Sequence, residues 1–512
     1  MNRSRRQFLA EVGHGMLVAS VGSALATDLG LGSRSFASDV SQRRLTFGAM
    51  EPLVALMQDT SADKLLPMVV TKLQTGMDLR TVVAAAALAN ARTFGGHNYD
   101  GYHTFMALAP SYQMAQELTA ERRALPVLKV LHRNARYIQN AGGCEHEALH
   151  EIEAAPERVK DEALRAATRQ ADQGKAERTF AALTKESLDD AYRQLQNCIQ
   201  DEVDVHRVVL SWRAWETLDF TGRDQALTLL RQSVRYCVDA EQERIKRNRP
   251  EPGVRATLTK LLDQHHLLGR KPGNQSAEDA WIEKMCQAIY TGNREQAAGA
   301  VAAALEEGIS PADIGEAISL AANRLVLRDP GRKQGDPLRP VGSVHGASVG
   351  VHASDSANAW RNIARVSDAR NTIASLIVAA YHTAGQAGMA AQKPYPWPEH
   401  LDAVKVTDAP ALLAELETGI KAKDQIRTSA VVQRYGELGH PPRAVFDLLL
   451  KYAISEDGAL HAEKYYRTVS EEFATTRPAF RWRQLVALAR VTSSEYGWPA
   501  PGYEDACRLL RA

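Results

Sequence analysis

Apolar residues recur at intervals of three and four along most of the chain, with polar and charged residues between them. This period is that of an amphipathic α-helix, whereas the strict alternation typical of a half-buried strand is scarce. The clearest predicted helices span residues 63–73, 79–92, 188–204, 223–247, 277–307, 311–327, 410–423 and 443–455. The sequence therefore predicts an all-α fold with a multi-helical body.

Proline and glycine mark several boundaries between these helices. Ser310-Pro311-Ala312-Asp313 combines an N-cap hydroxyl, a proline at the first helical position and an acidic residue, and all three favour a helix start. Helices are expected to stop at the proline-rich stretches 249–253, 271–274, 393–398 and 439–442. A longer loop, 328–340, precedes a histidine-bearing segment, and loops of this length often serve a site.

Two segments of the chain resemble each other. When Val69–Arg92 is laid on Val301–Arg324 without gaps, seven positions agree. Each copy predicts a helix, a glycine turn and an alanine-rich helix ending in arginine, and each is followed by paired histidines. We interpret this as two internally duplicated halves, 38–270 and 271–512, although alanine-rich helices also resemble one another by chance.

The second copy also carries a likeness to a known family. Residues 304–317, Ala-Leu-Glu-Glu-Gly-Ile-Ser-Pro-Ala-Asp-Ile-Gly-Glu-Ala, are similar to helical hairpins of the carboxymuconolactone decarboxylase and AhpD-like proteins. The likeness spans about twenty residues. The Cys-x-x-Cys of the peroxidase-linked members is absent, so the resemblance implies a helical hairpin and no catalytic residue.

The N-terminus reads as an export signal. Ser4-Arg5-Arg6-Gln7-Phe8-Leu9 resembles signals of the twin-arginine (Tat) pathway, and the following apolar stretch, 8–26, is too short and too polar to span a membrane. Cleavage is expected after Ala26 or Ala37. Residues 1–37 are therefore predicted to be a Tat signal peptide that binds the Tat translocase. This predicts a periplasmic or extracellular protein that is exported already folded.

Charge and cysteine content restrict the classes of binding partner and the folding compartment that the sequence predicts. Residues 1–37 hold four arginines and two acidic residues, so their removal changes the formal net charge from +1 to −1. This balance indicates neither a nucleic-acid nor an anionic-membrane partner, and no later apolar run predicts a stable membrane span. The five cysteines are odd in number and far apart, which fits folding in a reducing cytoplasm better than a disulfide framework.

Histidines at helical spacing beside carboxylates are the main candidates for chemistry. In the first group, His97, Asp100 and His103 are each three residues apart. On a helix this spacing brings the three side chains onto one face, where they could converge on one ion. The alternative is a buried polar helix start whose side chains satisfy hydrogen bonds.

The second group is His146-Glu147-Ala148-Leu149-His150, which matches the His-Glu-x-x-His pattern of the zincin metallopeptidases. On a helix, four-residue spacing sets both imidazoles on one face, and the glutamate could act as general base toward metal-bound water. The surroundings fit poorly, because Glu145 and Glu151 flank the motif and two glycines precede it. No third ligand follows from the sequence.

The third group contains His345 and His352, seven residues apart and therefore on one helical face, with Asp355 three residues later. Small residues around them permit close approach of another helix or a ligand; a tightly packed helix crossing is the alternative. His206 and His461 occur singly. They matter only if the fold brings them to the other groups, as in metal sites built from facing helices.

The chain has no dinucleotide fingerprint, phosphate-binding loop, Gly-x-Ser-x-Gly elbow or Cys-x-x-Cys-His. We therefore expect an exported helical metalloprotein that binds iron, zinc or copper through histidines, with oxidoreductase or hydrolytic chemistry on a small-molecule substrate. Asp100 or Glu147 would ligate the metal or move protons. The alternatives are a zinc metallopeptidase built on His146, Glu147 and His150, and a non-enzymatic helical scaffold or binding protein of the cell envelope.

Overall fold

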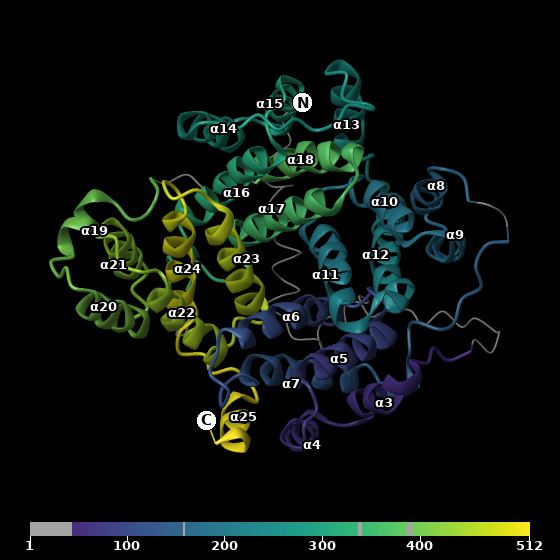
Figure 1. Cartoon of the computed structure of the whole chain (residues 1–512), viewed down its shortest axis with the longest axis horizontal. Helices are drawn as coiled ribbons and strands as arrows, with labels where there is room; N and C mark the ends of the chain where they lie inside the picture. The colour runs from purple at the N-terminus through teal and green to yellow at the C-terminus, as the bar shows by residue number, and fades with distance from the viewer. Residues whose placement is uncertain (1–42, 157–158, 336–339, 387–392, 512) are drawn as a thin grey trace. The chain divides into compact units, whose positions relative to one another are not determined.

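The computed structural model describes residues 43–156, 159–335, 340–386 and 393–511 (Figure 1). The predicted signal peptide, 1–37, lies outside these residues. Arg44–Ala512 forms one compact unit, which spans most of both predicted halves. Its described residues contain 23 α-helices and no strand, so the all-α prediction is confirmed. No helix among them is long and apolar enough to cross a membrane.

The helices follow one another with short connections. The first part of the unit contains η1 (Gly48–Met50), α3 (Glu51–Asp59), α4 (Ala62–Gln74), α5 (Leu79–Phe94), α6 (Tyr99–Gln116), α7 (Leu125–Asn140), η2 (Gly143–Glu145), α8 (Ala163–Arg169), α9 (Gln173–Glu186), α10 (Leu188–Ile199), α11 (Val205–Thr221), η3 (Arg223–Gln225), α12 (Ala226–Lys246) and α13 (Gly253–Gln264). The second part contains α14 (Asp279–Thr291), α15 (Arg294–Glu307), α16 (Pro311–Leu327), α17 (Val349–Val366), α18 (Ala369–Ala384), α19 (Pro398–Ala403), α20 (Ala409–Lys421), α21 (Gln425–Glu437), α22 (Arg443–Ser455), α23 (His461–Thr475), α24 (Trp482–Glu495) and α25 (Tyr503–Leu510).

Most of the predicted helices match observed ones, and two of the long predictions differ in an instructive way. The range 277–307 is divided at Gly292-Asn293, because Asn293 forms a capping box that starts α15. The range 188–204 ends at Ile199, because Asp204 accepts a hydrogen bond from the Arg207 backbone N–H and so caps a new helix, α11. Periodicity alone does not locate such breaks, since the apolar pattern resumes at once.

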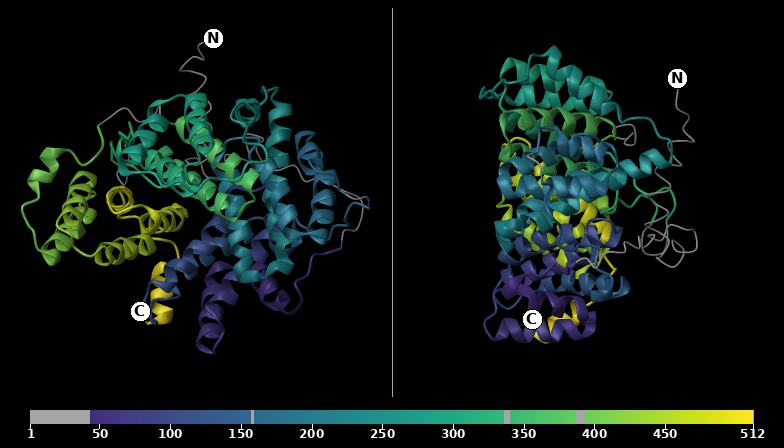
Figure 2. Two further views of the ribbon diagram at one scale, coloured as in Figure 1. Left: turned by 45° about the horizontal axis from the view of Figure 1, so that its top comes forward. Right: turned by 90° about the vertical axis from the view of Figure 1, so that its right-hand side faces the viewer.

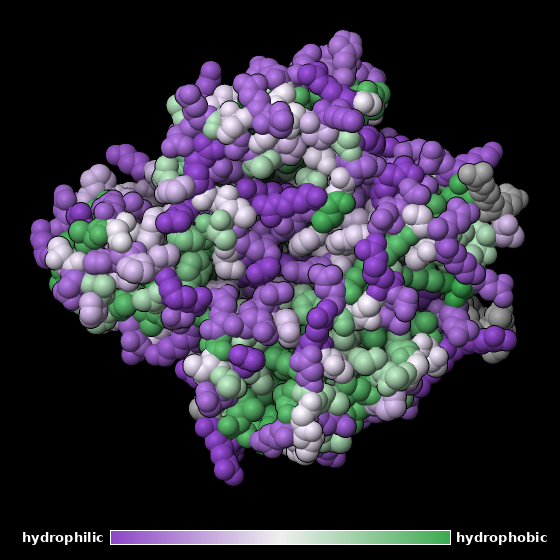
Figure 3. Space-filling view, in the orientation of Figure 1, coloured by the Kyte–Doolittle hydropathy of each residue, from purple (hydrophilic) through white to green (hydrophobic). Residues whose placement is uncertain are grey.

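Alanine-rich helices lie at the centre of the core. Helix α5 is buried along almost its whole length, and α16, α17 and α18 are buried almost as completely. Small side chains allow such helices to approach closely: a Cβ on Gly350 of α17 would lie 2.7 Å from the Val326 backbone nitrogen of α16. Surface residues are more polar, although Figure 3 shows hydrophobic residues gathering where α5 and α7 are drawn in Figure 1.

The two predicted copies have the same packing. Gly76 and Gly308 both have positive φ angles, +100° and +89°, and each ends the first helix of its copy. Helix α5 packs on α6 and α16 on α17, while α4 packs on α7 and α15 on α18. Duplication itself stays a prediction.

Four helices form a closed ring in which each packs on the next: α6 on α11, α11 on α17, α17 on α23 and α23 on α6. They surround the centre of the view in Figure 1. Helices α19, α20 and α21 lie on one flank in Figures 1 and 2 and join the rest through α20 and α21, which both pack on α24. The ring therefore draws together residues that are more than 350 positions apart in the sequence, since it contains both His103 and His461.

Candidate functional site

Each helix of the ring contributes one histidine, and the four imidazoles contact one another in the order of the helices. We call them the histidine tetrad: His103 of α6, His206 of α11, His352 of α17 and His461 of α23. Around the ring the centroid distances are 4.7 Å, 5.8 Å, 5.2 Å and 5.4 Å, starting from the His103–His206 pair. All four histidines lie near the N-terminal ends of their helices.

Local backbone features place these helix starts. Gly95 and Gly96 have positive φ angles before α6, and a Cβ on Gly96 would lie 2.3 Å from the Gln232 carbonyl oxygen. Ser348 caps α17 by accepting a hydrogen bond from the Val351 backbone N–H. Beside the tetrad, a Cβ on Gly346 would lie 2.7 Å from the Cβ of His461. Glycine at position 96 therefore allows the chain before α6 to approach α12, and glycine at position 346 allows the chain before α17 to lie against His461.

Hydrogen bonds fix the tautomers of two imidazoles. The Nδ1 atom of His103 lies 2.9 Å from the carbonyl oxygen of Tyr99, and that of His461 lies 3.1 Å from the carbonyl oxygen of Ala459. Carbonyl oxygens only accept, so each Nδ1 carries the proton and each Nε2 keeps a lone pair. In metal sites the same arrangement orients a histidine ligand and makes its Nε2 a better donor.

For His206, the carboxylate of Asp204 lies beside Nδ1, where His103 and His461 each have a carbonyl oxygen. Its Oδ1 atom lies 3.8 Å from Nδ1 of His206 and accepts hydrogen bonds from the Arg207 backbone N–H and the Tyr236 hydroxyl. Burial alone would raise the pKa of Asp204, but interactions with His206 and these hydrogen bonds hold the pKa below its usual value. The resulting negative charge favours a proton on Nδ1 of His206, which leaves the Nε2 lone pair free.

The Nε2 atoms have few protein partners. Those of His103 and His206 are buried, and neither has a hydrogen-bond partner within the described part of the chain. Those of His352 and His461 lie 3.2 Å apart. Burial lowers the pKa of His103, His352 and His461 well below 6.5, and Lys464 and the neighbouring imidazoles lower it further. At neutral pH these three imidazoles are therefore uncharged.

A buried acid and a buried base lie next to the tetrad. Asp355 follows His352 by one helical turn, and its Oδ1 accepts a hydrogen bond of 2.8 Å from the Thr468 hydroxyl. Burial raises the pKa of Asp355 to about 6, and burial lowers the pKa of Lys464 to about 8. The charge of Lys464 lowers the pKa of Asp355 and the charge of Asp355 raises the pKa of Lys464, so each partly offsets the effect of burial on the other. Asp355 can therefore exchange a proton close to neutral pH.

The side chains of the histidine tetrad are not arranged in the geometry of a metal site. Within the residues that the structure describes, no group of three or more His, Cys, Asp or Glu side chains is arranged to hold a metal. Tetrahedral bonds of about 2.0–2.1 Å from four imidazoles would place neighbouring ring centroids about 5.2 Å apart. The observed distances, 4.7 Å to 5.8 Å, differ from this by about 0.6 Å or less. Binding one ion would require the side chains to move, and a tetrahedral site would also bring the two opposite pairs of rings to this spacing.

The first predicted group is separated. Helix α6 begins at Tyr99, so His97 precedes the helix, and its Nδ1 contacts the carboxylate of Asp239 in α12. Asp100 lies in the first turn of α6. Burial raises the pKa of Asp100, and the charge of Arg133 opposes this rise. Of the three residues, only His103 joins the tetrad, and the predicted convergence of all three is wrong because the first of them is not helical.

The second predicted group, 146–150, is not helical. Helix η2 ends at Glu145, and residues 146–150 contain no helical turn, so the predicted pairing of His146 and His150 on one helical face is wrong. Glu147 makes ion pairs with Arg44 at 2.9 Å and with the buried Arg92 at 3.1 Å. The His150 carbonyl oxygen accepts a hydrogen bond from Arg231. These contacts tie the segment to neighbouring helices and remove the geometric basis of the zincin hypothesis.

The third group is partly brought together. His345 precedes α17 and is not on the helical face of His352, but its ring lies near enough to lower the pKa of His352 and His461 further. His206 and His461 join His103 and His352, as the hypothesis of facing helices requires.

Lys464 and Asp204 were not among the predicted site residues. Position alone could have indicated Asp204, because an N-cap aspartate two residues before a histidine in the first turn of a helix is near that ring.

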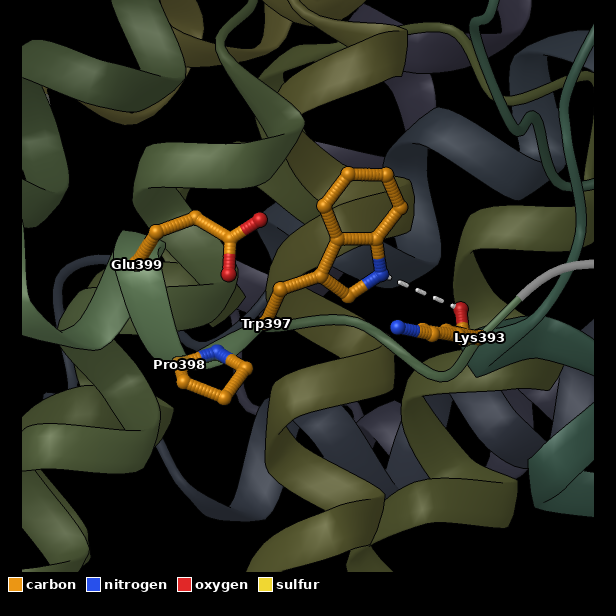
Figure 4. A pocket seen from close by; sticks show the side chains of 4 residues that line it. All are labelled: Lys393, Trp397, Pro398 and Glu399. Atoms are coloured by element: carbon orange, nitrogen blue, oxygen red, sulfur yellow. Dashed lines mark hydrogen bonds between the residues drawn. The ribbon is translucent and has the colours of Figure 1, made fainter.

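Two cavities lie outside the tetrad. One, of about 440 Å³, is lined by Lys393, Trp397, Pro398 and Glu399 (Figure 4), where the Trp397 indole N–H donates to the Lys393 carbonyl oxygen at 3.3 Å. The other, of about 650 Å³, lies beside the last turns of α11 and is lined by aromatic and charged residues. Neither is lined by a tetrad histidine.

Comparison of the chain with protein-family models, with curated proteins and with solved structures finds no match. Any functional conclusion must therefore rest on the chemistry of the residues themselves.

Proposed function

We propose that the histidine tetrad binds one transition-metal ion, and that the protein is a metal-dependent enzyme with oxidoreductase or hydrolytic activity. The observation that carries the proposal is the ring of four imidazoles, in which three Nδ1 atoms face acceptors and the opposite nitrogens are left with lone pairs. Histidines from facing helices hold metals in helical bundles in this way.

Unpartnered nitrogens favour a metal at this place. The buried Nε2 atoms of His103 and His206 have no hydrogen-bond partner in the described part of the chain, and a metal ion would bond to both. The separation between Nε2 of His352 and Nε2 of His461, 3.2 Å, matches two nitrogens that share a metal, which lie about 2.9 Å apart at right angles and about 3.3 Å apart in a tetrahedron. A hydrogen bond between the two rings gives a similar distance, so metal content decides between them.

The donor set limits the metal. Neutral imidazole nitrogens suit iron, zinc and copper, whereas magnesium and calcium prefer oxygen ligands. The N-terminal ends of four helices point their positive dipoles toward the tetrad, which favours an anionic additional ligand such as hydroxide. Asp355 would accept or supply a proton one helical turn away.

We infer export by the Tat pathway from the N-terminal signal sequence. A metal that is bound in the cytoplasm requires a route that accepts folded cargo, so export and metal binding support each other. In this view the protein works in the periplasm or outside the cell.

Elemental analysis tests the proposal. Protein purified without chelators is expected to carry about one iron, zinc or copper per chain, because four imidazoles supply enough ligands to hold one ion. Replacement of His461 by Gln should abolish stoichiometric metal, while replacement of His146 by Gln should not. A wild-type protein that stays folded without metal, and that gains none on titration, would support a non-enzymatic scaffold instead.

A further inference from the structure

The larger cavity has walls suited to a flat molecule. Its volume of about 650 Å³ is within the range of small-molecule sites. Four aromatic residues line it: Tyr112 of α6 and Trp212, Trp215 and Phe220 of α11. Aromatic faces of this kind bind planar rings by offset or edge-to-face stacking.

Neighbouring side chains hold these aromatic walls in place. The ring of Trp215 stacks on Tyr192 with a centroid distance of 4.1 Å and an interplanar angle of 18°. Tyr112 and Phe220 pack edge to face at 5.0 Å. Rings that are already packed lose little conformational freedom when a ligand binds, so less binding energy is spent on ordering the site.

Three acidic residues line the cavity, Glu216, Asp219 and Glu471, and the first and last form ion pairs with arginines. Asp219 lies beside Arg80, which also lines the cavity and donates a hydrogen bond to the Asp219 backbone carbonyl oxygen. Glu216 pairs with Arg213 at 2.7 Å, and Glu471 pairs with Arg467 at 2.6 Å. The side chains of Glu216 and Glu471 are only 9% and 14% exposed. Glu471 also accepts a hydrogen bond of 3.0 Å from the Asn362 side chain, whereas Glu216 keeps lone pairs that one guanidinium does not fill. The site therefore offers carboxylate acceptors beside an equal number of arginines, Arg80, Arg213 and Arg467, which suits neutral O–H donors better than charged groups.

From these features we propose that the cavity binds a neutral aromatic molecule that carries hydroxyl groups, of the phenol or catechol class. The ring lies against the aromatic walls, and the hydroxyl groups donate to Glu216 or Glu471. This site is separate from the histidine tetrad, since Glu216 follows His206 by ten residues, or about 15 Å along α11. The proposal does not depend on metal binding.

The cavity and the tetrad are nevertheless connected through one buried arginine. Arg213 pairs with Glu216 in the cavity wall and also interacts electrostatically with Asp355 beside the tetrad. A phenolic ligand bound to Glu216 would thus lie next to Arg213, which interacts with Asp355 beside the tetrad.

Titration with catechol, followed by tryptophan fluorescence and calorimetry, tests the proposal on the full mature chain. Saturable binding is expected, with benzoate, benzylamine and the non-aromatic cyclohexanediol binding at least about tenfold more weakly. Replacement of Trp215 by Leu, or independently of Phe220 by Leu, should weaken catechol binding at least about tenfold. Replacement of Trp397 by Leu, in the other cavity, should leave it unchanged.

Three results would overturn this assignment: no saturable binding of catechol, equal binding of the charged analogues, or unchanged affinity in both cavity variants. Circular dichroism shows whether each variant is folded. Because metal content is measured separately, failure here does not affect the proposal for the tetrad, and the reverse also holds.

Discussion

The histidine tetrad and the segment 146–150 contain the same kinds of residues but differ in what surrounds them. In the tetrad, four histidines from helices far apart in the sequence contact one another, and their Nε2 atoms have few protein partners. In segment 146–150, two histidines and a glutamate match a metallopeptidase motif, yet the chain is not helical there and the glutamate pairs with two arginines.

This difference follows from local structure. A motif with four-residue spacing forms a site only where the residues adopt a helix, because only the helix brings positions i and i+4 together. The left-handed Gly142 allows the ring of His146 to lie against it: a Cβ there would be 2.3 Å from that ring. A compact turn thus replaces the helix. Spacing along the chain is weaker evidence for a site than convergence in space.

The largest expected difference between the two regions is in metal content. Replacement of both His103 and His352 by Ala should lower bound metal at least tenfold, because half of the ligands are lost. The matched replacement of both His146 and His150 by Ala should leave metal content within error of the wild type. Inductively coupled plasma mass spectrometry measures both. Equal losses from the two variants would show that the tetrad is not the specific site.

A single methyl group near the tetrad should have the next largest effect. Replacement of Gly346 by Ala places a Cβ 2.7 Å from Cβ of His461 and must displace that histidine. We expect metal affinity to fall by about 10–100-fold, as for other changes that reorient a ligand. The control is Gly299 replaced by Ala, where the nearest atom to the new Cβ is 4.0 Å away. Competition with a chelator of known affinity gives the values, and similar affinities for both variants would refute the prediction.

The carboxyl group beside the tetrad should affect the pH dependence of stability. The pKa of Asp355 is raised from 3.8 to about 6, so the folded protein holds this proton while the unfolded chain has lost it. This group therefore lowers stability as the pH rises from about 4 to 6, by up to about 3 kcal/mol in total. Asn at this position removes the effect and keeps an acceptor for Thr468.

Urea unfolding of the metal-free protein at several pH values measures this contribution. The difference in unfolding free energy between Asp355→Asn and the wild type should grow from about pH 4 to pH 6 and then stay constant. Parallel curves across this range would show that Asp355 has an ordinary pKa.

The smallest expected effect concerns Glu147, and it separates a structural role from a catalytic one. Replacement by Gln weakens the ion pairs with Arg44 and the buried Arg92, so the unfolding free energy should fall by about 1–2 kcal/mol. Metal content should not change. A variant of unchanged stability that loses a hydrolytic activity would instead revive the metallopeptidase hypothesis.

Much of the fold could be predicted from the sequence, because helical periodicity is a local property. Helices α4, α5, α16 and α22 correspond closely to the predicted ranges. The breaks that periodicity misses are capping events, as at Asn293 and Asp204, where one polar side chain ends one apolar pattern and starts another.

The site could be predicted only in part. His103 and His352 stand out because each belongs to a group with a second histidine and a carboxylate, whereas His206 and His461 occur singly. His206 joins the tetrad because α11 packs between α6 and α17, and His461 joins it because α23 packs on α17 and α6. These are contacts between distant parts of the chain. Tautomers and burial depend on the same packing. No pattern within a short window contains this information.

X-ray absorption spectroscopy of the metal-loaded protein is the most direct test of the proposed site. We expect a first shell dominated by about four nitrogen ligands at about 2.0–2.1 Å, with the outer-shell scattering typical of imidazole rings, and loss of this signal in His461→Gln. A shell dominated by oxygen or sulfur, or one that is unchanged in His461→Gln, would contradict metal binding by the histidine tetrad.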